Sequence, residues 1–118
     1  MTPQKPGFNR NGWKWFEGLE RLYAFQYGEV VIYSGPIFIT HTYINEVRVP
    51  DYFWKVIYIP SINKNVSILA PNSDIHGQDI MTYLSTPKEI EQKANIVLPL
   101  PADADKNQMG DNDDVNVT

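Results

Sequence analysis

The sequence predicts an α+β fold, and three observations support this prediction. A helical pattern of Glu, Lys, Leu and Arg mixed with aromatic residues runs from Gly12 to about Gln26. Several short apolar runs follow, and their hairpin-like spacing favours an antiparallel sheet over a βαβ arrangement. A second, shorter helix is predicted after residue 84. The expected order is therefore one long helix, several strands and one late helix.

Length and composition restrict the classes of protein that are compatible with this chain. It has 118 residues, of which 42% are hydrophobic, so we expect one domain with a packed core. Cysteine is absent, which excludes disulfides and cysteine metal sites. No apolar run approaches the roughly 20 residues that cross a bilayer, so no membrane partner is expected.

The net charge of −4 resides in the C-terminal segment. Residues 102–118 contain five Asp and one Lys, and they carry almost no large apolar side chain. Such a segment cannot bury enough surface to offset the entropy lost on ordering. We therefore predict a domain at residues 1–101 and an acidic disordered tail at 102–118. The domain itself is electrically neutral, so its composition is not that of a basic nucleic-acid binder.

The first half of the chain predicts one helix and one interrupted strand. Asn9 or Asn11 is a suitable helix cap, and Gly28 is a suitable stop. The apolar run "EVVIY" at residues 29–33 predicts a buried strand, which "SGP" at 34–36 breaks before "IFIT" continues extended. Residues 41–50 are expected to form a loop.

The strongest strand signal is "YFWKVIYI" at residues 52–59, which is aromatic and β-branched and lies between Pro50 and Pro60. A turn at 61–65 and a strand at 66–71 are predicted to follow. Lys55, inside the strong strand, is expected either to point outward or to contact a nucleic-acid backbone; the sequence leaves both readings open.

A short apolar segment at residues 80–84 precedes the second helix. Ser85 or Thr86 is expected to cap this helix, with Pro87 at its first position and Glu89 in its first turn. Two helices do little to cover a sheet this apolar, so the chain is predicted to be part of a larger unit.

Four residues spaced by four lie in and just before the first helix: Asn9, Trp13, Glu17 and Arg21. Successive members are displaced by only about 40° around a helix, so they form one stripe. An amide oxygen and a carboxylate suit Mg²⁺, which keeps several waters, and an arginine beyond them can bind a phosphate. An alternative remains open: Asn9 as a helix cap, Trp13 in the core, and a Glu17–Arg21 salt bridge.

Longer motifs resemble one known family. The opening "MTPQKPGFNRNGWKWFE" is similar to the metal-site motif of the DNA/RNA non-specific endonucleases, the ββα-metal nucleases of the Serratia nuclease and endonuclease G type. The segments "YGEVVIYSGPIF", "VPDYFWKVIY" and "IMTYLSTPKEIEQKANIVLPLP" resemble later parts of that domain. The resemblance covers residues 1–101, with one departure: Asn11-Gly12 stands where the family has Gly and a variable residue.

The resemblance implies a partial ββα-metal fold and a one-metal phosphodiesterase that cleaves DNA and RNA. Asn9 would bind Mg²⁺ directly, with Mn²⁺ as a substitute, and Glu17 would bind the ion through water. Glu17 and Arg21 would be the catalytic residues, with Arg21 at the phosphate. Gln4 and Arg10 would support the metal-site loop or the substrate.

The family's general-base histidine belongs to a D-R-G-H segment, which this sequence does not contain. His41 and His76 match no catalytic position and are expected at the surface. The chain is therefore expected to be the C-terminal half of the domain, inactive alone, with the other half as a partner; the resemblance also allows a homodimer. The alternative is an inactive pseudonuclease remnant that binds nucleic acid or a protein. By analogy the compartment is secreted, periplasmic or mitochondrial.

Overall fold

The computed structural model describes residues 13–73 and 77–107, and within them it shows an α+β arrangement. Along the chain the elements are α1 (Lys14–Tyr27), β1 (Val31–Ile37), β2 (Tyr43–Ile44), β3 (Val47–Arg48), β4 (Tyr52–Ile59), the 3₁₀ turn η2 (Pro60–Ile62), β5 (Lys64–Pro71), the 3₁₀ segment η3 (Gly77–Tyr83), β6 (Leu84–Ser85) and α2 (Pro87–Ala94). The predicted α+β class and the antiparallel sheet are confirmed.

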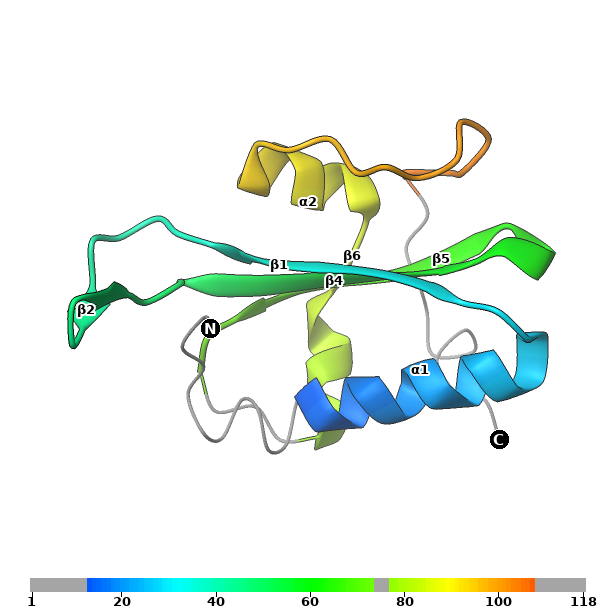
Figure 1. Ribbon diagram of the computed structural model, residues 1–118, viewed down its shortest axis with the longest axis horizontal. Helices are drawn as coiled ribbons and strands as arrows, with labels where there is room; N and C mark the ends of the chain where they lie inside the picture. The colour runs from blue at the N-terminus through cyan, green and yellow to red at the C-terminus, as the bar shows by residue number, and fades with distance from the viewer. Residues whose placement is uncertain (1–12, 74–76, 108–118) are drawn as a thin grey trace.

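One antiparallel sheet forms the centre of the molecule, with strand order β1-β4-β5-β6. Helix α1 lies against one face of this sheet and α2 against the other, so the sheet is the middle of three layers (Figure 1). Strand β1 is one of the two edge strands; within the described residues it pairs with β4 alone. None of the helices in the described part of the chain is long and apolar enough to span a membrane.

Alternating side chains of β4 and β5 pack into two separate hydrophobic cores, one on each face of the sheet. On the α1 side, Phe16, Leu19 and Tyr23 of the helix pack with β4 and β5 residues such as Ile57 and Ile68. On the α2 side the buried cluster consists of Ile37, Trp54, Val56, Ile90 and Leu98. This period-two alternation means that each residue of β4 belongs to one helix layer or the other.

The first helix ends and the second begins where the sequence predicts. Gly28 adopts φ 87°, and its backbone N–H donates to the carbonyl of Ala24 at 3.0 Å, which closes α1. The side chain of Thr86 accepts a hydrogen bond from the backbone N–H of Glu89 at 3.1 Å, and Pro87 begins α2. The caps predicted for the first helix, Asn9 and Asn11, lie outside the described residues.

The predicted break at residues 34–36 is wrong, because β1 continues through them to Ile37. Pro36 is tolerated because β1 is an edge strand, where a residue without a backbone donor costs least. Gly35 is needed for packing: a Cβ there would lie 2.9 Å from the indole of Trp54 on β4.

The predicted loop at residues 41–50 contains a small hairpin, β2–β3, at one end of the molecule (Figure 1). Its two turn residues, Asn45 and Glu46, have φ of 50° and 67°, the left-handed geometry of a tight two-residue hairpin turn. The apolar segment at 80–84 is mostly 3₁₀ helix, with only Leu84–Ser85 extended as β6.

The first residues of the acidic segment lie against the domain. The side chains of Asn63 and Asn65 donate to the carbonyls of Asp103 and Asp105, at 3.2 and 2.9 Å. Lys106 forms an ion pair with Glu91 of α2, with Nζ 2.7 Å from Oε2. Residues 108–118 lie outside the described part, so the predicted disordered tail stays a prediction.

Candidate functional site

The stripe predicted on the first helix turns gradually from the core to the solvent. Trp13 is 7% exposed, Glu17 is half-buried and Arg21 is exposed. This gradient follows from the helical repeat, because each step of four residues rotates the side chain about 40° further from the buried face. Asn9, the first member of the stripe, lies outside the described residues, as do Gln4 and Arg10.

Glu17 and Arg21 are not tied to each other. Within residues 13–73 and 77–107, neither side chain takes part in a hydrogen bond or an ion pair. The alternative prediction is therefore right about Trp13, which is core, and wrong about the salt bridge. Among the described residues, therefore, no partner occupies the half-buried carboxylate of Glu17 or the exposed guanidinium of Arg21 one turn later.

Beside this stripe lies a buried ion pair that the sequence did not predict. Lys55 of β4 points toward α1, and its Nζ lies 2.6 Å from Oε1 of Glu20, with the two side chains 8% and 14% exposed. The same ammonium lies 4.6 Å from the ring centroid of Trp13. Lys55 is therefore buried, and neither of the roles expected for it from the sequence matches its position.

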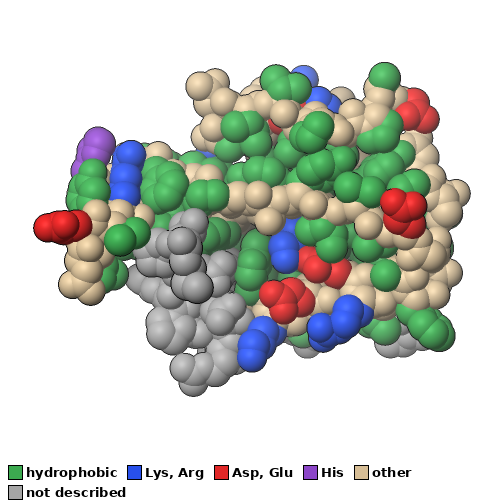
Figure 2. Space-filling view, viewed as in Figure 1, with side chains coloured by type: hydrophobic (Ala, Val, Ile, Leu, Met, Phe, Trp, Pro, Cys, Tyr) green, Lys and Arg blue, Asp and Glu red, His purple; other side chains and the backbone are tan. Residues whose placement is uncertain are grey.

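The charged side chains of this region gather over α1, below the edge of the sheet. Figure 2 shows side chains of both signs lying close together there. On α1 itself the charged residues are Lys14, Glu17, Glu20 and Arg21. A flank with mixed charge can hold a cation and an anion side by side, which a purely basic surface cannot do.

A metal ion would need donors from outside the described residues. No group of three or more His, Cys, Asp or Glu side chains that could hold an ion occurs among the residues described. Glu20 is occupied by Lys55, whereas Glu17 has no ion-pair partner among the described residues. One carboxylate plus an amide oxygen fits Mg²⁺, since this ion binds few protein ligands and keeps several waters.

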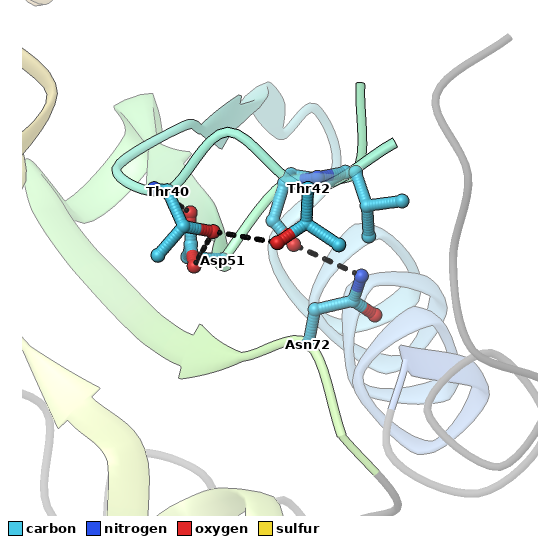
Figure 3. Close-up of a pocket in the computed structure, with 6 residues that line it drawn as sticks. Thr40, Thr42, Asp51 and Asn72 are labelled. Atoms are coloured by element: carbon cyan, nitrogen blue, oxygen red, sulfur yellow. Dashed lines mark hydrogen bonds between the residues drawn. The ribbon is translucent and has the colours of Figure 1, made fainter. Parts of the chain in front are cut away.

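A hollow of about 200 Å³ lies at the base of the β2–β3 hairpin, apart from the charged flank of α1. Figure 3 shows Thr40, Thr42, Asp51 and Asn72 around it. Oδ2 of Asp51 accepts hydrogen bonds from the backbone N–H groups of Ile39 and Thr40, at 2.7 and 2.8 Å. Because these bonds favour the charged form, they hold the pKa of Asp51 below its usual value. The hydroxyl of Thr40 donates to Oδ1 of Asp51 at 2.9 Å, so both carboxylate oxygens are engaged by the segment that leads to the hairpin.

Of the two histidines, only His41 lies among the described residues, and it is not part of α1. His41 is exposed in the segment before β2, as expected, and the hairpin region where it lies is far from α1 along the sheet (Figure 1). His76 lies outside the described residues. The charged side chains on the described part of this flank are therefore two carboxylates, an arginine and lysines, without a histidine.

Comparison with known proteins identifies related sequences. The family described as DNA/RNA non-specific endonuclease matches residues 1–104. Similar proteins are Nuclease C1 of Cunninghamella echinulata var. echinulata (29% identity, 80% of this chain and 44% of that protein), mitochondrial Endonuclease G of Bos taurus (26%, 86% and 39%) and mitochondrial Nuclease 1 of Schizosaccharomyces pombe (30%, 80% and 36%). The chain thus spans less than half the length of these relatives.

Proposed function

Because the chain belongs to the DNA/RNA non-specific endonuclease family, we propose that it supplies the metal-binding and phosphate-binding part of a magnesium-dependent nuclease domain. One observation carries the proposal. Glu17 and Arg21 lie one turn apart on an accessible flank of α1, and neither is engaged by another described residue. A carboxylate and a guanidinium in this relation suit a hydrated cation next to a phosphate.

The proposed roles follow from the chemistry of each side chain. Asn9 would bind the ion directly and Glu17 would hold it through water, while Gln4 and Arg10 would support the preceding loop. The ion, when bound, supplies a Lewis acid and a template for the phosphodiester. Arg21 would donate two parallel hydrogen bonds to a phosphate, which fixes the substrate's position as well as its charge.

We propose that the general base comes from polypeptide outside these 118 residues, consistent with the larger size of the relatives. A positioned base contributes roughly 10²–10⁴ to the rate, so the chain alone should be a very poor nuclease. The alternative, an inactive remnant that binds nucleic acid, shares the phosphate-binding flank but does not need the metal. DNA and RNA are the proposed substrates, and the two mitochondrial relatives favour a mitochondrial location.

The test uses the purified 118-residue chain and a fluorescent oligonucleotide. We expect Arg21→Gln to weaken binding measured by anisotropy and to lower the slope of log affinity against log salt by about 1. Lys88→Gln is the matched control, since it removes an exposed positive charge from α2 on the other side of the sheet. Equal effects of both variants would contradict a phosphate site on α1.

Two further measurements distinguish the part of a metal-dependent nuclease from an inactive remnant. Titration with Mg²⁺, followed by NMR, should shift the amides of Glu17 and of Asn9; a chain with no such response would be a remnant that has lost the metal. Plasmid nicking by the chain should not exceed that of buffer with Mg²⁺. Chelator-sensitive nicking that is lost in Asn9→Ala would show that a residue within the chain serves as the base.

A further inference from the structure

The Glu20–Lys55 ion pair points to a role for Lys55 in orienting α1. This inference rests on the function proposed for the α1 flank. We propose that Lys55 is a positioning residue, which fixes the rotation of α1 about its own axis and thereby the direction of Glu17 and Arg21. Lys55 belongs to the sheet and Glu20 to the helix, so the pair joins the two layers directly.

The contacts of Lys55 surround Glu17 along the helix. Its ammonium lies 2.6 Å from Glu20 Oε1, 4.6 Å from the ring centroid of Trp13 and 5.9 Å from that of Phe16. Trp13 and Phe16 stand four and one positions before Glu17, and Glu20 stands three positions after it. A helix held at these points cannot rotate without breaking the ion pair or moving an aromatic face from the cation.

Lys55 is surrounded by apolar side chains on its own strand. The other β4 residues in the α1-side core, Phe53, Ile57 and Ile59, are apolar and buried. Replacing a buried ion pair by apolar residues of similar volume is often neutral or stabilising, because two charges must otherwise be desolvated. Apolar contacts are non-directional, whereas a buried ion pair between sheet and helix restricts α1 to rotations that keep Glu20 Oε1 next to Lys55 Nζ.

The experiment compares Lys55→Met with the double variant E20Q/K55M, which removes both charges and keeps the core volume. Residual dipolar couplings measure the orientation of α1 relative to β4, and a Mg²⁺ titration measures the response of the Glu17 amide. Lys106→Met is the matched control: it removes an ion pair of similar length, 2.7 Å, between α2 and the following segment.

We expect the double variant to remain folded, with α1 reoriented and the Glu17 response to Mg²⁺ reduced about tenfold, the loss typical when groups that orient metal ligands are removed. Lys55→Arg, which keeps the charge, should restore part of both signals, and Lys106→Met should change neither. An unaltered α1 orientation in E20Q/K55M would overturn the proposal. Unfolding of both Lys55→Met and E20Q/K55M would also overturn it, because the ion pair would then contribute to global stability.

The two arms also separate this proposal from the proposed function. If wild-type Glu17 does not respond to Mg²⁺, the metal site is wrong, but the orientation of α1 still decides whether Lys55 sets the helix rotation. If wild-type Glu17 responds and the double variant responds equally, the metal site stands and the positioning role of Lys55 is refuted.

Discussion

Asp51 holds Thr40 at two points, accepting one hydrogen bond from its backbone N–H at 2.8 Å and another from its hydroxyl at 2.9 Å. The two residues stand at the start of β4 and in the segment that leads to the β2–β3 hairpin. A two-residue ladder is only marginally stable in water, so these bonds help to fix the base of the hairpin, together with the bond from the Val49 N–H to the Thr42 carbonyl.

Asp51→Asn should therefore destabilise the protein in a pH-dependent way. The folded pKa of Asp51 is lowered, so its contribution to stability is fully present above the unfolded value of about 3.9 and is lost as the pH falls through the folded pKa. The difference in unfolding free energy between wild type and variant should be constant near neutral pH and shrink below about pH 4. Urea denaturation at several pH values measures it.

The control for this series is Asp103→Asn. Asn63 binds the backbone carbonyl of Asp103, so loss of the carboxylate leaves that contact in place. A gap between wild type and Asp51→Asn that does not narrow on acidification would show that the charge of Asp51 contributes nothing to folding.

Gly35 is predicted to be intolerant of even one extra carbon. A Cβ at this position would meet three indole atoms of Trp54 at 2.9–3.0 Å. Overpacking of this kind typically costs about 1–3 kcal/mol of unfolding free energy, and Gly35→Ala should show a loss in that range. Gly18→Ala is the matched control: a Cβ there meets nothing within 4 Å, and in the helix interior it should stabilise by about 0.5–1 kcal/mol. A neutral Gly35→Ala would mean that Trp54 repacks freely.

Removal of the α2 cap should be measurable by itself. Thr86→Ala removes the side-chain acceptor for the Glu89 N–H and should lower the unfolding free energy by about 1 kcal/mol. Gln92→Ala, at an exposed position of the same helix, should change it by no more than about 0.5 kcal/mol. Equal losses in the two variants would argue against the cap, because alanine favours a helix and Gln92→Ala should not lower the unfolding free energy by itself.

The core between α1 and the sheet should be the most sensitive to loss of volume. Ile57 is fully buried there, and Ile57→Ala should destabilise by about 2–5 kcal/mol, since the surrounding side chains cannot close the cavity completely. Ile62, which is 40% exposed in η2, provides the control, for which the same substitution should cost about 0.5 kcal/mol or less. Thermal or urea unfolding monitored by circular dichroism compares the two.

Local chemistry explains which elements could be predicted from the sequence. Strand β4 lies between two prolines and is β-branched and aromatic throughout, and the structure reproduces the predicted bounds 52–59. The end of α1 at Gly28 and the start of α2 at Thr86 follow from residues with one preferred backbone geometry. In each case the residues that decide the structure are adjacent in sequence.

Features that depend on distant residues were missed. Whether "SGP" breaks a strand depends on β4, whose pairing carries β1 through Pro36 at an open edge. The hairpin at 43–48 lacks the usual Gly in its turn and is held at its base by Asp51, which lies outside it. The direction of Lys55 was open because the partner that draws it inward, Glu20, lies 35 positions earlier.

The candidate site was predictable only as a helical stripe. Spacing by four placed Trp13, Glu17 and Arg21 in order, and the gradient from buried to exposed follows the same geometry. The spacing could not decide whether Glu17 and Arg21 pair with each other, because i and i+4 side chains can do so without being forced to. The roles proposed for Asn9, Gln4 and Arg10 stay predictions.

The position of β4 in the sheet has a consequence for the timescales of motion. Strand β4 is bonded on both sides and most of its residues are buried, whereas β1 pairs on one side only within the described residues. Amide hydrogens of β4 should therefore exchange with solvent last, through near-global opening, while β1 frays in smaller and more frequent openings. Lys55 belongs to β4, so its ion pair joins α1 to the strand that opens last. The charged flank of α1 should therefore keep its structure while the edge strand β1 opens and closes.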